Sequence, residues 1–172
     1  MKVSDAIRAT VLALFVSVPA FSQPLVPPYA ETVNLAGPRF GGTFLSEGVV
    51  KKLETSSGTE INPFVTQFGW QFEKQFYAPK SGPTALTEAV VLLGGMEQGI
   101  VIPSLSWLVG LRTREGAEFA IGPNITPAGV ALALAAGTTF RAGVLNIPVN
   151  FAVVPSRSGM RVSFLTGFTL RR

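Results

Sequence analysis

Few residues in this chain could carry catalytic chemistry. The sequence contains no histidine and no cysteine, which excludes serine–histidine hydrolases, cysteine nucleophiles with a histidine base and the common zinc sites. After the first 22 residues every carboxylate side chain is a glutamate, and no glutamate pair has a spacing that singles it out for acid–base work. We therefore expect no catalytic activity, no cofactor and no metal ion.

A larger set of polar residues shares one property, which is its place on the polar side of alternating segments. Both signs of charge occur in this set, and an isolated buried charge is costly, so the members should pair with one another if they face a narrow interior. We expect a network of salt bridges and amide hydrogen bonds, with a polar pathway or a ligand site as the functional alternative. Its candidate members are Arg39, Gln67, Gln71, Glu73, Glu88, Arg112, Glu118, Arg141 and Arg161.

The clearest alternation lies in the segment FVTQFGWQFEKQFY, residues 64–77. Aromatic residues occupy one parity and mostly amides or glycine the other. A period of two places the aromatics on one face of a strand, whereas a helix of 3.6 residues per turn would scatter them. The segment therefore predicts a two-faced strand.

Similar segments separated by turn residues predict about eight strands in an all-β chain. Turns such as Arg114-Glu115-Gly116 and Arg141-Ala142-Gly143 suit antiparallel hairpins. The segment Thr84 to Gly95 shows no clear alternation. The expected strands are Val33 to Phe44, Asn62 to Tyr77, Thr84 to Gly95, Ile100 to Thr113, Gly116 to Gly122, Gly129 to Phe140, Val144 to Pro155 and Gly159 to Arg171.

Two prolines and two leucines depart from this pattern. Pro103 and Pro148 fall inside expected strands, and each predicts a bulge or a bend because proline cannot donate to a strand ladder. Leu108 and Leu165 fall on the polar parity of their strands.

The composition of the two faces favours a barrel with lipid outside. A soluble barrel packs large apolar residues inside and shows water a surface rich in lysine and glutamate. Here the face opposite the aromatics is glycine, alanine, serine and amides with isolated charges, as in a narrow lumen. The candidate lipid-facing or girdle residues are Phe68, Trp70, Phe72, Phe76, Trp107 and Phe168.

The first 22 residues have the pattern of a secretory signal. Lys2 and Arg8 precede an apolar run that is shorter than the roughly 20 residues of a membrane-spanning helix. We expect a signal peptide at 1–22, a proline-rich leader at 23–32 and a barrel domain at 33–172. Removing two basic and one acidic residue leaves 14 − 2 = 12 basic and 10 − 1 = 9 acidic residues, and the arginines form no cluster that would bind nucleic acid.

One long loop is expected, from Phe44 to Asn62. Within it Ser46 to Thr55 sets Val49, Val50 and Leu53 on one side of a possible short helix. This helix could lie at a membrane interface or form a lid over the barrel mouth; the simpler alternative is a loop with one helical turn.

The chain resembles the small outer-membrane β-barrels of the OmpA-like and OmpX-like group. The resemblance is carried by FVTQFGWQFEKQFY, by PSLSWLVGLRT and by the closing segment GMRVSFLTGFTLRR, with Phe168 and Leu170 at alternate positions. It implies a closed up-and-down antiparallel barrel in the outer membrane, with membrane lipid as a partner and other envelope proteins as candidate partners.

These observations predict a small outer-membrane β-barrel with a structural or interaction role in the cell envelope. Two alternatives stay open. One is a soluble periplasmic barrel that binds a small apolar ligand, and the other is a lipid-modifying membrane enzyme that uses Glu73 or Glu88.

Overall fold

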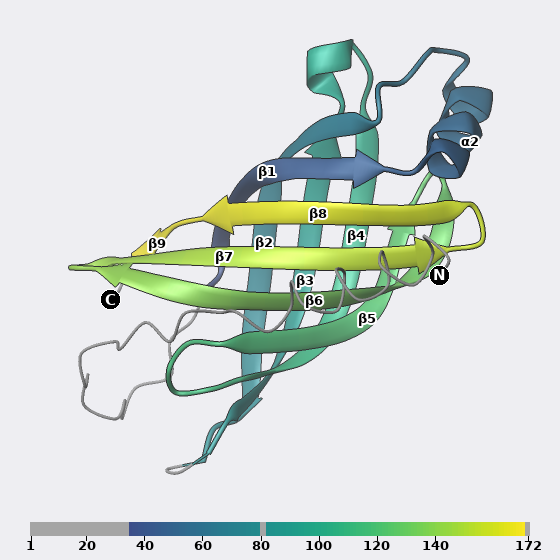
Figure 1. Cartoon of the computed structure of the whole chain (residues 1–172). Coiled ribbons are helices and arrows are strands. Elements are labelled where there is room, and N and C mark those ends of the chain that lie inside the picture. The colour runs from purple at the N-terminus through teal and green to yellow at the C-terminus, as the bar shows by residue number, and fades with distance from the viewer. Residues whose placement is uncertain (1–34, 80–81, 171–172) are drawn as a thin grey trace, which may run out of the picture.

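The computed structural model describes residues 35–79 and 82–170, which form one closed antiparallel β-barrel (Figure 1). Consecutive strands pair around the wall, and β1 pairs with β8 to close it, which confirms the predicted all-β, up-and-down barrel of about eight strands. The short β9 continues the last strand along β7. The strands are β1 (Gly37–Leu45), β2 (Phe64–Tyr77), β3 (Thr84–Gly94), β4 (Ile102–Arg112), β5 (Glu118–Thr126), β6 (Gly129–Ala142), β7 (Leu145–Ser156), β8 (Gly159–Gly167) and β9 (Thr169–Leu170).

One α-helix, α2 (Glu47–Ser57), follows β1, as predicted for the first long loop. A 3₁₀ helix, η1 (Met96–Gln98), joins β3 to β4. No helix in the described part of the chain is long and apolar enough to cross a membrane. The predicted signal peptide and leader, and the first two residues of the predicted barrel domain, lie outside the described residues.

The up-and-down order gives the barrel two different ends. The connections β1–β2, β3–β4, β5–β6 and β7–β8 lie at one end, which carries α2 and is called the helix end below. The first described residues, β9 and the connections β2–β3, β4–β5 and β6–β7 lie at the other, called the terminal end.

The strands alternate between an apolar exterior and an interior of mixed polarity. On β2 the aromatic residues are exposed, whereas Val65 and Gln71 are buried in the lumen. Leu108 and Leu165, which broke the predicted pattern, are buried inside the barrel. The alternation of β3 is weak in the sequence because its inward residues, such as Leu86 and Leu92, are as apolar as its outward ones.

Of the bulge or bend predicted at Pro103 and Pro148, the bulge is wrong at both positions. The pairings of β4 with β3 and of β7 with β6 run through both prolines without a change of register; among the described pairs the one shift lies between Gln75 and Tyr77. Pro103 precedes the first β4–β5 pair, so no partner strand needs its missing N–H on that side.

Pro148 instead interrupts the other ladder of its strand. It lies between Asn146, which pairs with β9, and Val149, which pairs with β8. The closing strand is therefore divided at Phe168, where a single strand was predicted. Proline provides the reason, because it has no N–H to donate to the neighbouring strand.

Candidate functional site in the barrel lumen

Charged residues near the terminal end of the lumen gather around Arg112, the last residue of β4. Its Nε donates to Glu118 Oε2 at 2.6 Å, and its Nη1 donates to Glu73 Oε1 at 2.8 Å. The Oε1 atom of Glu88 lies 3.9 Å from Arg112 Nη2. All four side chains are buried, so one guanidinium from β4 compensates carboxylates from β2, β3 and β5.

The network continues to Arg39 on β1. Gln71 donates from Nε2 to Glu88 and accepts from Arg39 Nε at 3.0 Å. The remaining nitrogens of the Arg39 guanidinium donate to main-chain carbonyls, with Nη2 at 2.6 Å from the Leu35 oxygen. Hydrogen bonds and ion pairs thus link β1 to β5 along the inside of the wall near the terminal end.

The three glutamates are close enough to be considered as ligands of a cation. Carboxylate oxygens of Glu73, Glu88 and Glu118 lie within 4.8 Å of one another. The guanidinium of Arg112 forms ion pairs with all three. This arrangement is that of a structural ion-pair cluster.

Polar side chains also line the middle of the lumen. Thr43 donates to Gln67 Oε1 at 2.7 Å, and its hydroxyl lies 2.7 Å from that of Ser163, so β8, β1 and β2 are joined where the barrel closes. On the facing wall Asn124 donates to the hydroxyls of Ser104 and Ser106 at 2.9 and 2.8 Å. Sequence reasoning missed Asn124 because it ended the fifth strand at Gly122; the alternation Glu118, Ala120, Gly122, Asn124, Thr126 would have included it.

Arg141 differs from the other predicted network residues in its exposure. Its side chain is exposed near the end of β6, beside the β6–β7 turn, although its parity in the strand is that of a lumen residue. The other eight predicted network residues line the lumen. Seven belong to the Arg112 cluster or to the middle layer, and the eighth, Arg161, lies at the helix end.

Arg161 occupies the opposite end of the lumen from Arg112. It lies in β8 just after the β7–β8 turn, and it is 7% exposed. Its Nη1 donates to the Thr126 hydroxyl at 2.5 Å. Its Nε is buried without a hydrogen-bond partner, and no carboxylate among residues 35–79 and 82–170 forms an ion pair with it.

A cavity of about 80 Å³ lies in the lumen, lined by Arg161 at the helix end and by Arg39, Gln71 and Glu88 toward the terminal end. About half of its wall is aliphatic or alanine side chains and about half is polar or charged, including Arg39 and Glu88. Asn150 also lines it, and its Oδ1 is buried without a partner among the described residues. This volume counts the positions open to the centre of a water molecule, so the space that the wall encloses is larger and can hold several waters or one small organic molecule.

The chain matches no known protein family, curated protein or solved structure. The resemblance to small outer-membrane barrels therefore remains one of residue pattern.

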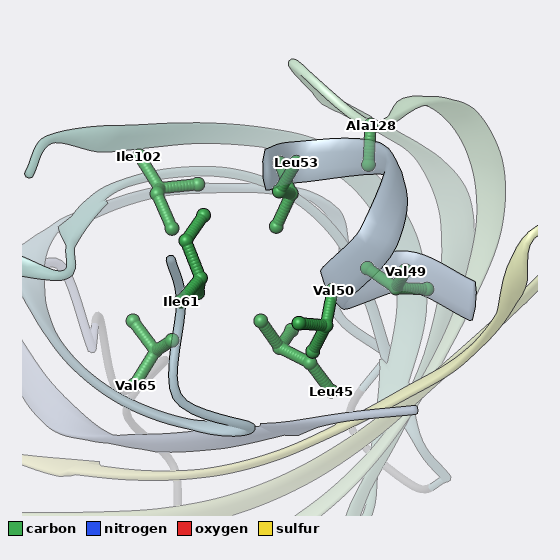
Figure 2. Close-up of a cluster of buried hydrophobic side chains, with 8 residues drawn as sticks. All are labelled: Leu45, Val49, Val50, Leu53, Ile61, Val65, Ile102 and Ala128. Carbon is green, nitrogen blue, oxygen red and sulfur yellow. The ribbon is translucent and has the colours of Figure 1, made fainter. Parts of the chain in front are cut away.

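The helix end of the lumen is covered by α2. Figure 2 shows side chains from α2, its following loop and the surrounding strands turned toward one another inside the barrel mouth. Val49 and Leu53 are almost completely buried, so α2 does not rest on the outer surface but packs into the opening. The cluster consists of Leu45, Val49, Val50, Leu53, Ile61, Val65, Ile102 and Ala128. The segment thus has the position of a lid over the barrel mouth, which was one of the two functional interpretations of the sequence; the other was a helix at the membrane interface.

The position of α2 depends on close backbone contact. A Cβ atom at Gly48 would lie 2.1 Å from the carbonyl oxygen of Ser158, in the β7–β8 turn. The Ser46 hydroxyl, just before the helix, accepts a hydrogen bond from the Met160 amide at 2.9 Å. The Glu54 carboxylate accepts another from the Ile61 amide at 3.0 Å. The helix is therefore fixed at both of its ends.

The predicted lipid-facing residues all point away from the lumen. Each is between 47% and 61% exposed, and they come from β2, β4 and the Phe168 position between β8 and β9. Their neighbours on the outer surface are also large and apolar on every strand of the barrel wall. These six residues are Phe68, Trp70, Phe72, Phe76, Trp107 and Phe168.

Proposed function

We propose that this protein is an integral β-barrel of an outer membrane, exported through its N-terminal signal, with a structural or interaction role in the cell envelope and no catalytic activity. The observation that carries the proposal is the inversion of the two faces: every strand of the wall exposes large apolar side chains, and six of the eight charged strand residues line the lumen.

The outer surface supports contact with lipid because its apolar residues are continuous. Exposed hydrophobic patches on soluble monomers rarely exceed a few hundred Å², whereas here large apolar side chains cover all eight strands. If water surrounded the barrel, this apolar surface would make the protein prone to aggregation. Lipid removes that difficulty, because hydrocarbon solvates such side chains without cost.

Strand length is also suited to a bilayer. The 11 residues of β3, at about 3.3 Å each, give a strand about 36 Å long. With the tilt of about 40° that a closed barrel requires, such a strand covers about 28 Å along the barrel axis. This is close to the roughly 30 Å thickness of a bilayer's hydrocarbon core.

The distribution of charge supports the same proposal. Six charged strand residues line the lumen, where the barrel wall separates them from any surrounding lipid. Lys74 is an exposed charge on the outward parity of β2, close to the terminal end of that strand. A lysine near the boundary of the apolar surface can extend its ammonium group to the headgroups.

A soluble barrel that binds an apolar ligand would need the reverse arrangement of faces. Its large apolar side chains would line the interior, and its surface would be polar. In this chain Phe68 and Trp70 point outward while Gln67 and Gln71 point inward. The geometry therefore favours the membrane protein over this alternative.

The two tryptophans provide a direct test, because Trp70 and Trp107 both lie on the outer surface. We expect the native protein to need detergent for extraction and to migrate differently on gels before and after heating. In vesicles, lipids brominated on their acyl chains should quench the fluorescence of both tryptophans strongly, and aqueous acrylamide should quench it weakly. Recovery of a folded barrel in the soluble periplasmic fraction, with efficient acrylamide quenching, would refute the proposal.

A further inference from the structure

Arg161 is a buried cation whose charge is not balanced locally. Three arginines and three glutamates line the lumen, so their formal charges cancel over the whole interior. The positive and negative charges are, however, unevenly distributed along the barrel. All three glutamates surround Arg112 near the terminal end, while Arg161 lies at the helix end with a threonine hydroxyl as its hydrogen-bond acceptor. Such a charge is expensive to bury unless an anion compensates it.

The cavity gives this cation a place for an anion. Arg161 lines the cavity wall, and its Nε donor is unused by the described residues. Asn150 lines the same cavity with an unused buried acceptor, Oδ1. The cavity therefore presents one charged donor and one neutral acceptor, both of which water or a ligand would satisfy.

Part of the cavity wall is apolar and suited to a short hydrocarbon group. Leu53, Ala128 and Val154 line it near the helix end, and Leu165 and Ala152 line it farther in. Apolar walls gain nothing from a fully hydrated inorganic ion, but they favour a ligand that removes a few CH₂ groups from water, each worth about 0.8 kcal/mol. A guanidinium is planar and matches a carboxylate with paired N–H donors.

We propose that the lumen binds a short-chain monocarboxylate, with its carboxylate on Arg161 and its alkyl chain in the apolar part of the cavity. The volume of about 80 Å³ limits the chain to a few carbons, which excludes the long acyl chains of membrane lipids. A metal cation is disfavoured because Arg161 repels it. The inference concerns the inside of the barrel, so it does not depend on whether lipid surrounds the outside.

The test uses the purified full-length barrel in detergent, with butyrate as the probe. Binding is measured by calorimetry and by the NMR signal of ¹³C-labelled butyrate carboxylate. We expect saturable binding, weakened at least tenfold in Arg161→Gln. The matched control is Arg157→Gln, which removes an exposed arginine from the neighbouring β7–β8 turn and should change affinity less than twofold. Butanol, which has the same chain without the carboxylate, should bind at least tenfold more weakly.

A second variant separates loss of the site from loss of the fold. Ala152→Leu keeps Arg161 and fills the cavity, so it should abolish butyrate binding while gel migration still shows a folded barrel. The proposal is overturned if native protein shows no saturable butyrate binding below about 10 mM. It is also overturned if Arg161→Gln or Ala152→Leu binds as the native protein does, if butanol binds equally well, or if chloride alone occupies the site.

Discussion

Arg112 and Glu118 face each other at paired positions of β4 and β5, and Arg112 Nε lies 2.6 Å from Glu118 Oε2. The same guanidinium contacts Glu73 two strands away on β2. A cross-strand pair next to a hairpin is thus extended into a cluster that holds four consecutive strands together. The contribution of this cluster to the stability of the barrel can be measured by removing the guanidinium of Arg112.

Arg112→Met should destabilise the barrel by about 3–5 kcal/mol, because three buried carboxylates would lose the cation that compensates them. The measurement is the midpoint of urea unfolding in detergent, followed by gel migration. Glu118→Gln should cost less, since Arg112 keeps its contacts with Glu73 and Glu88. Lys51→Met, which removes an exposed ion pair on α2, should leave the midpoint unchanged. Equal effects in all three variants would contradict the role given to Arg112.

A cation placed in the middle of the outer surface should be costly if that surface contacts hydrocarbon. Ile121 is exposed near the middle of β5, and Ile121→Arg should lower the free energy of unfolding in vesicles by about 2–4 kcal/mol. Tyr77→Arg, at the terminal end of β2, should cost about 0–1 kcal/mol because the arginine reaches the headgroups. If the two variants were equally stable, the exterior would not be in a bilayer.

The outer surface could be predicted from sequence because alternation is a local property. The aromatic parity of residues 64–77 needs no knowledge of the partner strands. The segment that forms β3 shows no clear alternation in the sequence because both of its faces are apolar: Leu86 and Leu92 face the lumen, and Val91 faces outward. Its apolar inward residues line or adjoin the cavity, which is a feature of the closed barrel rather than of the strand.

Contacts within the lumen could be predicted only in kind. The alternation of each strand places Arg112, Glu73 and Arg161 on the inward face, but it does not show which of these side chains contact one another. The pairing of Arg112 with Glu118 follows from a short hairpin, whereas its contact with Glu73 spans 39 residues and depends on strand register. Arg161 has no carboxylate partner in the described residues because strand closure places it at the other end of the barrel.

Displacement of α2 should open the helix end of the lumen. Gly48→Ala adds a Cβ that would lie 2.1 Å from the Ser158 carbonyl oxygen, so the helix must shift. The natural chain has no cysteine, and Ala128→Cys therefore places a single thiol within the cluster under α2. We expect thiol labelling at position 128 to be at least tenfold faster with Gly48→Ala. With Lys51→Ala, on the exposed face of the helix, the rate should not change.

The β3–β4 connection should lose one of its anchors in acid. Burial acts to raise the pKa of Glu97, but hydrogen bonds from the Thr66 hydroxyl and amide outweigh it and lower the pKa to about 2. The usual value is 4.5, so the folded state favours the carboxylate. This stabilisation is therefore fully present above about pH 4.5 and is lost as the pH falls through about 2. An NMR titration of the Glu97 side chain should give this low pKa, and Thr66→Val should raise it toward 4.5. The exposed Thr55→Val is the control and should leave it unchanged; a normal pKa in the native protein would show that the Thr66 contacts are not maintained.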